Sequence, residues 1–117
     1  MVSAFLVGGD NLNELNFREL LRSKEEKRII TGKITGIEDE YYKIKNEKIP
    51  CAIVWYEDIK ILIPISHLGI SKQTKSMLRG MLGSEIDFIV MEIDETTNLA
   101  IASRINAMNL RAKLELP

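Results

Sequence analysis

The segment Lys60-Ile-Leu-Ile-Pro-Ile-Ser-His-Leu-Gly69 combines a strand pattern with a proline and a polar turn. Isoleucines at positions 59, 61 and 63 alternate with other residues, and this period of two is typical of a β-strand. Pro64 has no N–H to donate to a sheet ladder, so we expect the strand to end there or to lie at a sheet edge. A polar turn follows, and the sequence predicts strands both before and after it.

Composition limits the possible architectures. The chain has 117 residues, of which 45% are hydrophobic and 28% are charged. This length is sufficient for one compact domain with an added helix. The formal net charge of −1 gives no general attraction for phosphate, so any nucleic-acid site must be a local patch.

The single cysteine, Cys51, allows neither an intrachain disulfide nor a cysteine zinc site. It favours a reducing, cytoplasmic setting. No apolar run approaches the roughly 20 residues that span a bilayer. The segment Met1–Val7 has no basic residue and is a poor signal peptide, so no membrane association is expected.

Residues 1–27 are expected to form a tail and one amphipathic helix. Hydrophobic residues recur at helical spacing after Gly9, with charges between them. Asp10 or Asn11 is the expected N-cap. The pattern leaves two interpretations open: the helix covers the domain, or it docks a partner protein.

Four further strands are predicted, at residues 28–39, 51–56, 84–94 and 99–103. They are rich in isoleucine, valine and threonine, which fit a pleated surface. Glycines in the first of these strands indicate a bulge or a close backbone approach, as in a strand that bends around a small barrel. Residues 40–50 are expected to form a loop or a frayed hairpin. Their tyrosines and lysines either contact RNA or simply cover the edge of the core.

The position of Trp55 decides the predicted orientation of the strand at residues 51–56. A lone tryptophan in a small domain is usually a packing anchor, so Trp55 is expected in the core together with Ile53. The alternative is a ligand platform. With Trp55 inward, Tyr56 faces outward and lies near Lys60 across the hairpin.

Two helices complete the prediction. A helix is expected over residues 71–82, capped by Ser71, with Met77, Leu78, Met81 and Leu82 as core-filling residues. Residues 105–117 are expected to form a C-terminal helical extension. The predicted domain organisation is therefore a leading helix in 1–27, a barrel in 28–104 and the extension in 105–117.

Five short strands with a helix between the third and fourth are the pattern of a mainly β, five-stranded OB-fold Greek-key barrel. Closure of the sheet into a barrel also removes exposed edges. The fold class predicted from the sequence is this barrel with flanking N- and C-terminal helices.

The chain resembles the S-one RNA-binding domain over about residues 28–104. Four segments carry the resemblance, and they occur in the family's order and spacing. They are Thr31-Gly-Lys-Ile-Thr-Gly-Ile37, Ile61-Leu-Ile-Pro-Ile-Ser-His-Leu68, Gly83-Ser-Glu-Ile-Asp-Phe-Ile-Val-Met-Glu-Ile-Asp94 and Ile101-Ala-Ser-Arg104. The chain departs from the family where a Phe-Gly stretch opens the second strand, since residues 49–52 are Ile-Pro-Cys-Ala.

The resemblance implies a non-catalytic module that binds single-stranded RNA on the barrel face of strands two and three. The expected partners are RNA and, through it, the ribosome or the RNA-turnover machinery. Stacking on aromatic rings and pairing of phosphates with basic groups are the expected contacts. The residues predicted to bind RNA are Lys33, Tyr42, Tyr56, Lys60, His67, Asn98 and Arg104.

The sequence offers no constellation for catalysis. Its single histidine and single cysteine are far apart, no metal-ligand spacing is visible, and no cofactor is expected. The alternative to RNA binding is a protein-interaction module that keeps the barrel and uses the flanking helices. The near-neutral charge and the departure at residues 49–52 favour that alternative.

Overall fold

The computed structural model describes residues 9–42 and 47–115. The described elements follow one another in an order close to the expected one. They are α1 (Gly9–Glu26), β1 (Ile30–Tyr42), β2 (Glu47–Tyr56), β3 (Ile59–Pro64), the short 3₁₀ helix η1 (Ile65–His67), α2 (Lys75–Arg79), β4 (Glu85–Asp94), β5 (Leu99–Ser103) and α3 (Arg104–Glu115).

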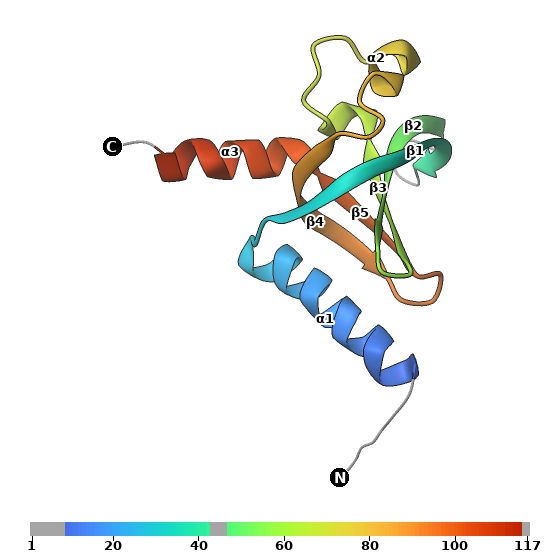
Figure 1. The fold of residues 1–117 in the computed structure, drawn as a ribbon, viewed down its shortest axis with the longest axis vertical. Helices are drawn as coiled ribbons and strands as arrows, with labels where there is room; N and C mark the ends of the chain where they lie inside the picture. The colour runs from blue at the N-terminus through green and yellow to red at the C-terminus, as the bar shows by residue number, and fades with distance from the viewer. Residues whose placement is uncertain (1–8, 43–46, 116–117) are drawn as a thin grey trace.

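The five strands close into a barrel in the order β1-β2-β3-β5-β4 (Figure 1). All neighbouring strands are antiparallel except β3 and β5, which pair in parallel. Pairing of β1 with β4, from Ile30 opposite Phe88 to Lys33 opposite Glu85, closes the ring. The prediction of a mainly β chain with five strands and flanking helices is confirmed.

Branched and aromatic side chains fill the barrel interior. Ile59, Ile61 and Ile63 of β3 all point into it, so the alternation read from the sequence is confirmed. Gly32 of β1 allows the close packing, because a Cβ there would lie 2.5 Å from the Cγ1 of Val54. The interior therefore has no room for a larger residue at position 32.

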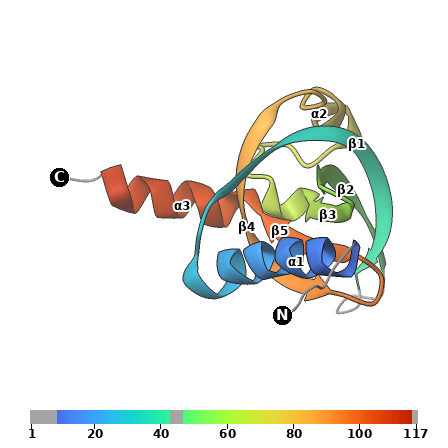
Figure 2. The same ribbon diagram turned by 60° about the horizontal axis from the view of Figure 1, so that its bottom comes forward.

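Helical segments close both ends of the barrel. At the lower end in Figure 1, α1 runs beneath the barrel beside β4 and buries Phe17 and Leu20 in the core. At the upper end, Leu68 and Leu78 come from the connection between β3 and β4. Figure 2 shows α1 lying across its end of the ring, whereas α3 runs outward from the barrel. The helix α1 thus covers the barrel, the first of the two interpretations of its pattern.

The expected helix over residues 71–82 is mostly absent. Only Lys75–Arg79 is α-helical, and its N-cap is Thr74, whose side chain accepts a hydrogen bond from the Met77 N–H; Ser71 is not the cap. Of the four apolar residues predicted to fill the core from this segment, only Leu78 is buried, whereas Met77 and Leu82 are exposed. Met81 is partly buried and packs against the core, so Leu78 and Met81, two of the four predicted residues, contribute to this end of the barrel.

The β1–β2 hairpin is more regular than the expected loop at residues 40–50. Its two strands pair from Ile37 opposite Ala52 up to Tyr42 opposite Glu47. A register shift between Ile34 and Gly36 marks a bulge in β1, as the glycine spacing indicated. No helix of the described chain is both long and apolar enough to cross a membrane.

Candidate nucleic-acid interface on strands β2 and β3

The outer face of strands β2 and β3 presents a second, separate set of side chains. Cys51, Ile53 and Leu62 form a small apolar cluster distinct from the barrel interior. Trp55 continues this row along β2, and Lys60 lies directly opposite it on β3. We call the side of the sheet that carries these five residues the β2–β3 outer face; Trp55 is exposed, Lys60 is partly exposed, and the three cluster residues are buried.

Trp55 lies on the outer face, so the expectation that it anchors the core is wrong. Its side chain is 51% exposed, whereas Val54 is buried in the interior. The two-residue turn after Tyr56 sets this orientation, because it pairs Trp55 with Lys60 and Val54 with Ile61. Paired residues share a face, so the inward Ile61 takes Val54 inward and the outward Lys60 takes Trp55 outward.

Lys60 is held in place by two partners. Its Nζ lies 2.9 Å from both carboxylate oxygens of Glu38 on β1. The same Nζ lies 5.9 Å from the centroid of the Trp55 ring, within cation–π range. An exposed aromatic ring and a partly exposed lysine therefore meet on this face.

Tyr56 does not join this arrangement, so the expectation that it faces outward beside Lys60 is wrong. Its ring is half-buried and packs against the barrel core. Burial raises the pKa of its phenol, and the nearby carboxylates of Glu19 and Glu57 raise it further. Tyr56 thus belongs to the lower end of the barrel, and the predicted pair of Tyr56 and Lys60 is replaced by Trp55 and Lys60.

His67 has a structural partner away from the β2–β3 outer face. Its Nδ1 lies 3.0 Å from the Oγ of Ser103, which is fully buried. The same Oγ accepts a hydrogen bond from the backbone N–H of Asn106 at the start of α3. His67 therefore helps to fix the junction between β5 and α3, and the structure does not bring it together with Lys60.

Asn98 lies at the same end of β3 as Lys60. Its carbonyl accepts a hydrogen bond from the Lys60 N–H at 3.0 Å, and its own backbone is left-handed with φ 53°. Asparagine tolerates this conformation better than most residues. The backbone of Asn98 thus completes the β4–β5 turn. Tyr42 ends β1, and its side chain lies outside the part that the structure describes.

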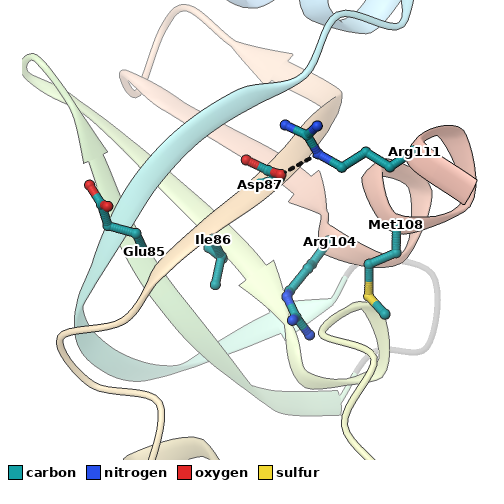
Figure 3. A pocket seen from close by; sticks show the side chains of 6 residues that line it. All are labelled: Glu85, Ile86, Asp87, Arg104, Met108 and Arg111. Carbon is teal, nitrogen blue, oxygen red and sulfur yellow. Dashed lines mark hydrogen bonds and ion pairs between the residues drawn. The ribbon is translucent and has the colours of Figure 1, made fainter. Parts of the chain in front are cut away.

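Lys33 and Arg104 lie on another side of the barrel. Lys33 is exposed on β1 opposite Glu85 of β4. Arg104 donates a hydrogen bond to the Leu68 carbonyl at 2.8 Å and lines a pocket of about 180 Å³ between β4 and α3. Figure 3 shows this pocket, whose lining residues are Glu85, Ile86, Asp87, Arg104, Met108 and Arg111. The seven predicted residues therefore do not form one site.

The pocket between β4 and α3 is internally paired. Asp87 accepts hydrogen bonds from Thr31 and from the Arg111 guanidinium (Figure 3). The Thr31 hydrogen bond is the main reason why the pKa of Asp87 lies below its usual range, and Arg111 and Arg104 lower it further. This carboxylate thus offsets the positive charge of the arginines, which leaves the pocket a weak anion site.

Within residues 9–42 and 47–115, no group of three or more histidine, cysteine or acidic side chains could hold a metal ion. Cys51 is buried, and its Sγ lies 3.4 Å from the Ile49 carbonyl oxygen.

Comparisons with known proteins give distant similarities only. No family model matches this chain, and no curated protein matches it. Among solved structures, it is similar to GSP13 from Bacillus subtilis, known from a solution structure, with 21% sequence identity and a TM-score of 0.48 over 77% of this chain and 58% of that one. It is also similar to a chain in the crystal structure of the a/eIF2alpha–aDim2p–rRNA complex from Pyrococcus horikoshii OT3, with 14% identity and a TM-score of 0.49 over 75% of this chain and 49% of that one. The chain spans only about half the length of these proteins, and its fold is established by its own strand pairing.

Proposed function

We propose that this chain is a non-catalytic, S-one-like RNA-binding module that takes single-stranded RNA on the β2–β3 outer face. The observation that carries the proposal is the half-exposed ring of Trp55 beside Lys60, near the turn end of the β2–β3 hairpin. The barrel order β1-β2-β3-β5-β4 supports the OB-fold assignment, in which the face of strands two and three binds oligonucleotides. Cys51 as the single cysteine supports a reducing, cytoplasmic setting.

The proposed contact is stacking of one unpaired base on Trp55. Every base has a π-face, so such a contact tolerates many sequences and contributes about 1–3 kcal/mol per base. The Phe-Gly stretch is absent at residues 49–52, and Trp55, further along the same strand, supplies an aromatic surface instead. The RNA targets proposed from the resemblance are those of the ribosome or of RNA turnover.

The test uses the only tryptophan of the chain as its own reporter. A short mixed-sequence single-stranded RNA is titrated into the full chain while the fluorescence of Trp55 is followed. We expect saturable quenching. RNA binding by Trp55→Ala is measured from backbone amide NMR shifts. We expect its affinity to be at least about fivefold weaker, which corresponds to about 1 kcal/mol, the lower end of the range for stacking. Trp55→Phe is the matched control and should retain most of the affinity.

An unquenched Trp55, with amide shifts that lie elsewhere or are absent at low salt, would reject the proposed face. The fold of Trp55→Ala is checked by urea unfolding. Since the ring is half-exposed, its loss should change stability little compared with that of a buried aromatic residue. If Trp55→Ala loses both its fold and its RNA binding, the affinity of Trp55→Phe decides, because that variant keeps an aromatic ring at position 55.

A second candidate function is a protein-interaction module that uses the flanking helices. It is favoured by exposed apolar side chains on both helices, which include Leu15 and Leu21 on α1 and Met108 and Leu114 on α3. Leu114 is 72% exposed on the part of α3 that runs outward from the barrel (Figure 1). Pull-down with Leu15→Lys and Leu114→Lys variants tests this function, and partners that both variants retain would contradict it.

A further inference from the structure

The lysine beside the proposed stacking ring is already paired with an acid. Lys60 makes two bonds of 2.9 Å to the carboxylate of Glu38, and only a quarter of its side chain is exposed. Glu38 itself is 42% exposed, so the pair lies at the surface of the sheet rather than in the core. The positive charge next to Trp55 is therefore offset within the protein before any RNA arrives.

The rest of the β2–β3 outer face adds no charge. Cys51, Ile53 and Leu62 are apolar and buried within their small cluster. An approaching strand of RNA thus meets an aromatic ring and a neutralised ion pair. A base can stack on such a surface. A phosphate contact adds little affinity there, because that affinity comes from unpaired protein cations that displace counterions from the RNA.

We infer that Glu38 determines the specificity of this face by keeping Lys60 on the ring of Trp55 and away from phosphates. This inference rests on the proposed function and concerns the source of its affinity: stacking of the unpaired base supplies it, and pairing of Lys60 with the RNA backbone does not, because Glu38 holds Lys60. Duplex RNA, which offers phosphates and few accessible base faces, is excluded. Binding by the unmodified chain has a shallow salt dependence.

Glu38→Gln tests the role of the acid, because glutamine keeps the size of the side chain and removes its charge. Lys60 is then available to one phosphate, which steepens the slope of log affinity against log salt by about 0.7 for a single strand. Between 50 and 200 mM salt, this slope corresponds to an additional loss of affinity of about 2.5-fold. The variant is also expected to gain affinity for duplex RNA at low salt.

Two further variants make the test specific. Asp39→Asn is the matched control: Asp39 is the neighbouring carboxylate, is similarly exposed, and pairs with Lys75 at 2.9 Å away from Trp55. It should leave the salt slope for single-stranded RNA unchanged. Glu38→Gln combined with Lys60→Met removes both charges but keeps the aliphatic part of the lysine side chain, so the salt slope should return to that of the unmodified chain.

The outcomes separate this inference from the proposed function. Quenching of Trp55 by RNA with an equal salt slope in Glu38→Gln and the unmodified chain would overturn the role of Glu38 and leave RNA binding intact. An unmodified chain that already shows a steep slope, or that binds duplex RNA as well as single strands, would also overturn it. Absence of any RNA binding at low salt would reject the proposed function and this inference together.

Discussion

The hydroxyl of Ser23 accepts a hydrogen bond from the backbone N–H of Val90 at 3.0 Å. It also donates one to the Arg28 carbonyl at 2.7 Å, so a single buried side chain ties α1, the following turn and β4 together. Val90 is a buried residue next to the register shift between β4 and β5, and its N–H bonds to the serine of the covering helix. The attachment of α1 to the barrel is therefore specific as well as hydrophobic.

Removal of this hydroxyl should destabilise the fold. Ser23→Ala leaves the buried N–H of Val90 without its partner, and an unsatisfied buried donor costs about 1–3 kcal/mol. Urea unfolding followed by circular dichroism measures the change in the free energy of unfolding. Ser71→Ala, at an exposed site that is not a helix cap, is the control and should lie within about 0.5 kcal/mol of the unmodified chain. Equal stability of the two variants would contradict the role given to Ser23.

A methyl group at position 32 should be poorly tolerated. The Cβ of Gly32→Ala would lie 2.5 Å from the Cγ1 of Val54, and overpacking of a filled core costs typically about 1–3 kcal/mol. Gly36→Ala is the control, because its Cβ would lie at an ordinary 3.8 Å from the Cβ of Ile53. Combining Gly32→Ala with Val54→Ala should cost less than the sum of the two single changes. If the losses in the free energy of unfolding of the two single variants simply add in the double variant, the added methyl group does not clash with Val54, and the prediction is contradicted.

Asp87 should make the domain less stable in acid. Since its pKa in the folded chain is lowered, chiefly by the Thr31 hydrogen bond, the unfolded state binds its proton more readily. The stabilisation is thus present above the pKa of an unfolded aspartate and is lost as the pH falls through the lower folded value. Asp87→Asn should reduce this acid-dependent loss in unfolding measurements between pH 2 and 6, a range chosen to include the usual aspartate pKa of about 3.9. Glu92→Gln, at an exposed site on the same strand, is the control. An unchanged pH profile in Asp87→Asn would contradict the prediction.

Tyr56 should have the opposite effect at high pH. Its pKa is raised above that of an unfolded tyrosine, mainly by burial, so the folded chain holds the phenol proton more tightly. The corresponding stability is complete below a pH of about 10 and is lost as the pH rises through the folded pKa. Tyr56→Phe removes this group and should flatten the decline in the free energy of unfolding between about pH 9 and 11. The other two tyrosines remain in the variant, so a decline as steep as that of the unmodified chain would assign the effect to them.

Local pattern was sufficient to predict the strand set. The alternation of isoleucines at 59, 61 and 63 and the proline at 64 give a strand whose bounds, Ile59–Pro64, match the structure. The β4–β5 hairpin also follows from its own residues, since Asp94 accepts a hydrogen bond from the Thr96 N–H within the turn. Both features depend on residues that are close together in the sequence, so a local pattern is sufficient to predict them.

The orientation of Trp55 was also within reach of the sequence. A two-residue turn at Glu57-Asp58 pairs Trp55 with Lys60, and the inward isoleucines of β3 already place Lys60 outside. The expectation that a lone tryptophan fills the core overrode this register argument. The interior position beside Gly32 and Phe88 is taken by Val54, whose Cγ1 would lie 2.5 Å from a Cβ at position 32. Burial preference is an average, whereas the pairing register is a geometric constraint that moves every side chain of a strand together.

Local sequence patterns suffice to predict the five strands and the outward direction of Lys60 on β3. They also give packing on the domain as one of two interpretations of the first helix. Which residues meet depends on the tertiary fold. Hydrogen bonds join Glu38 to Lys60, His67 to Ser103 and Ser23 to Val90, which are 22, 36 and 67 residues apart in the sequence. The tertiary fold also separates Lys33 and Arg104 from the β2–β3 outer face. Strand formation depends on local backbone and side-chain preferences, whereas a site depends on barrel closure and register, which bring together residues that no local pattern relates.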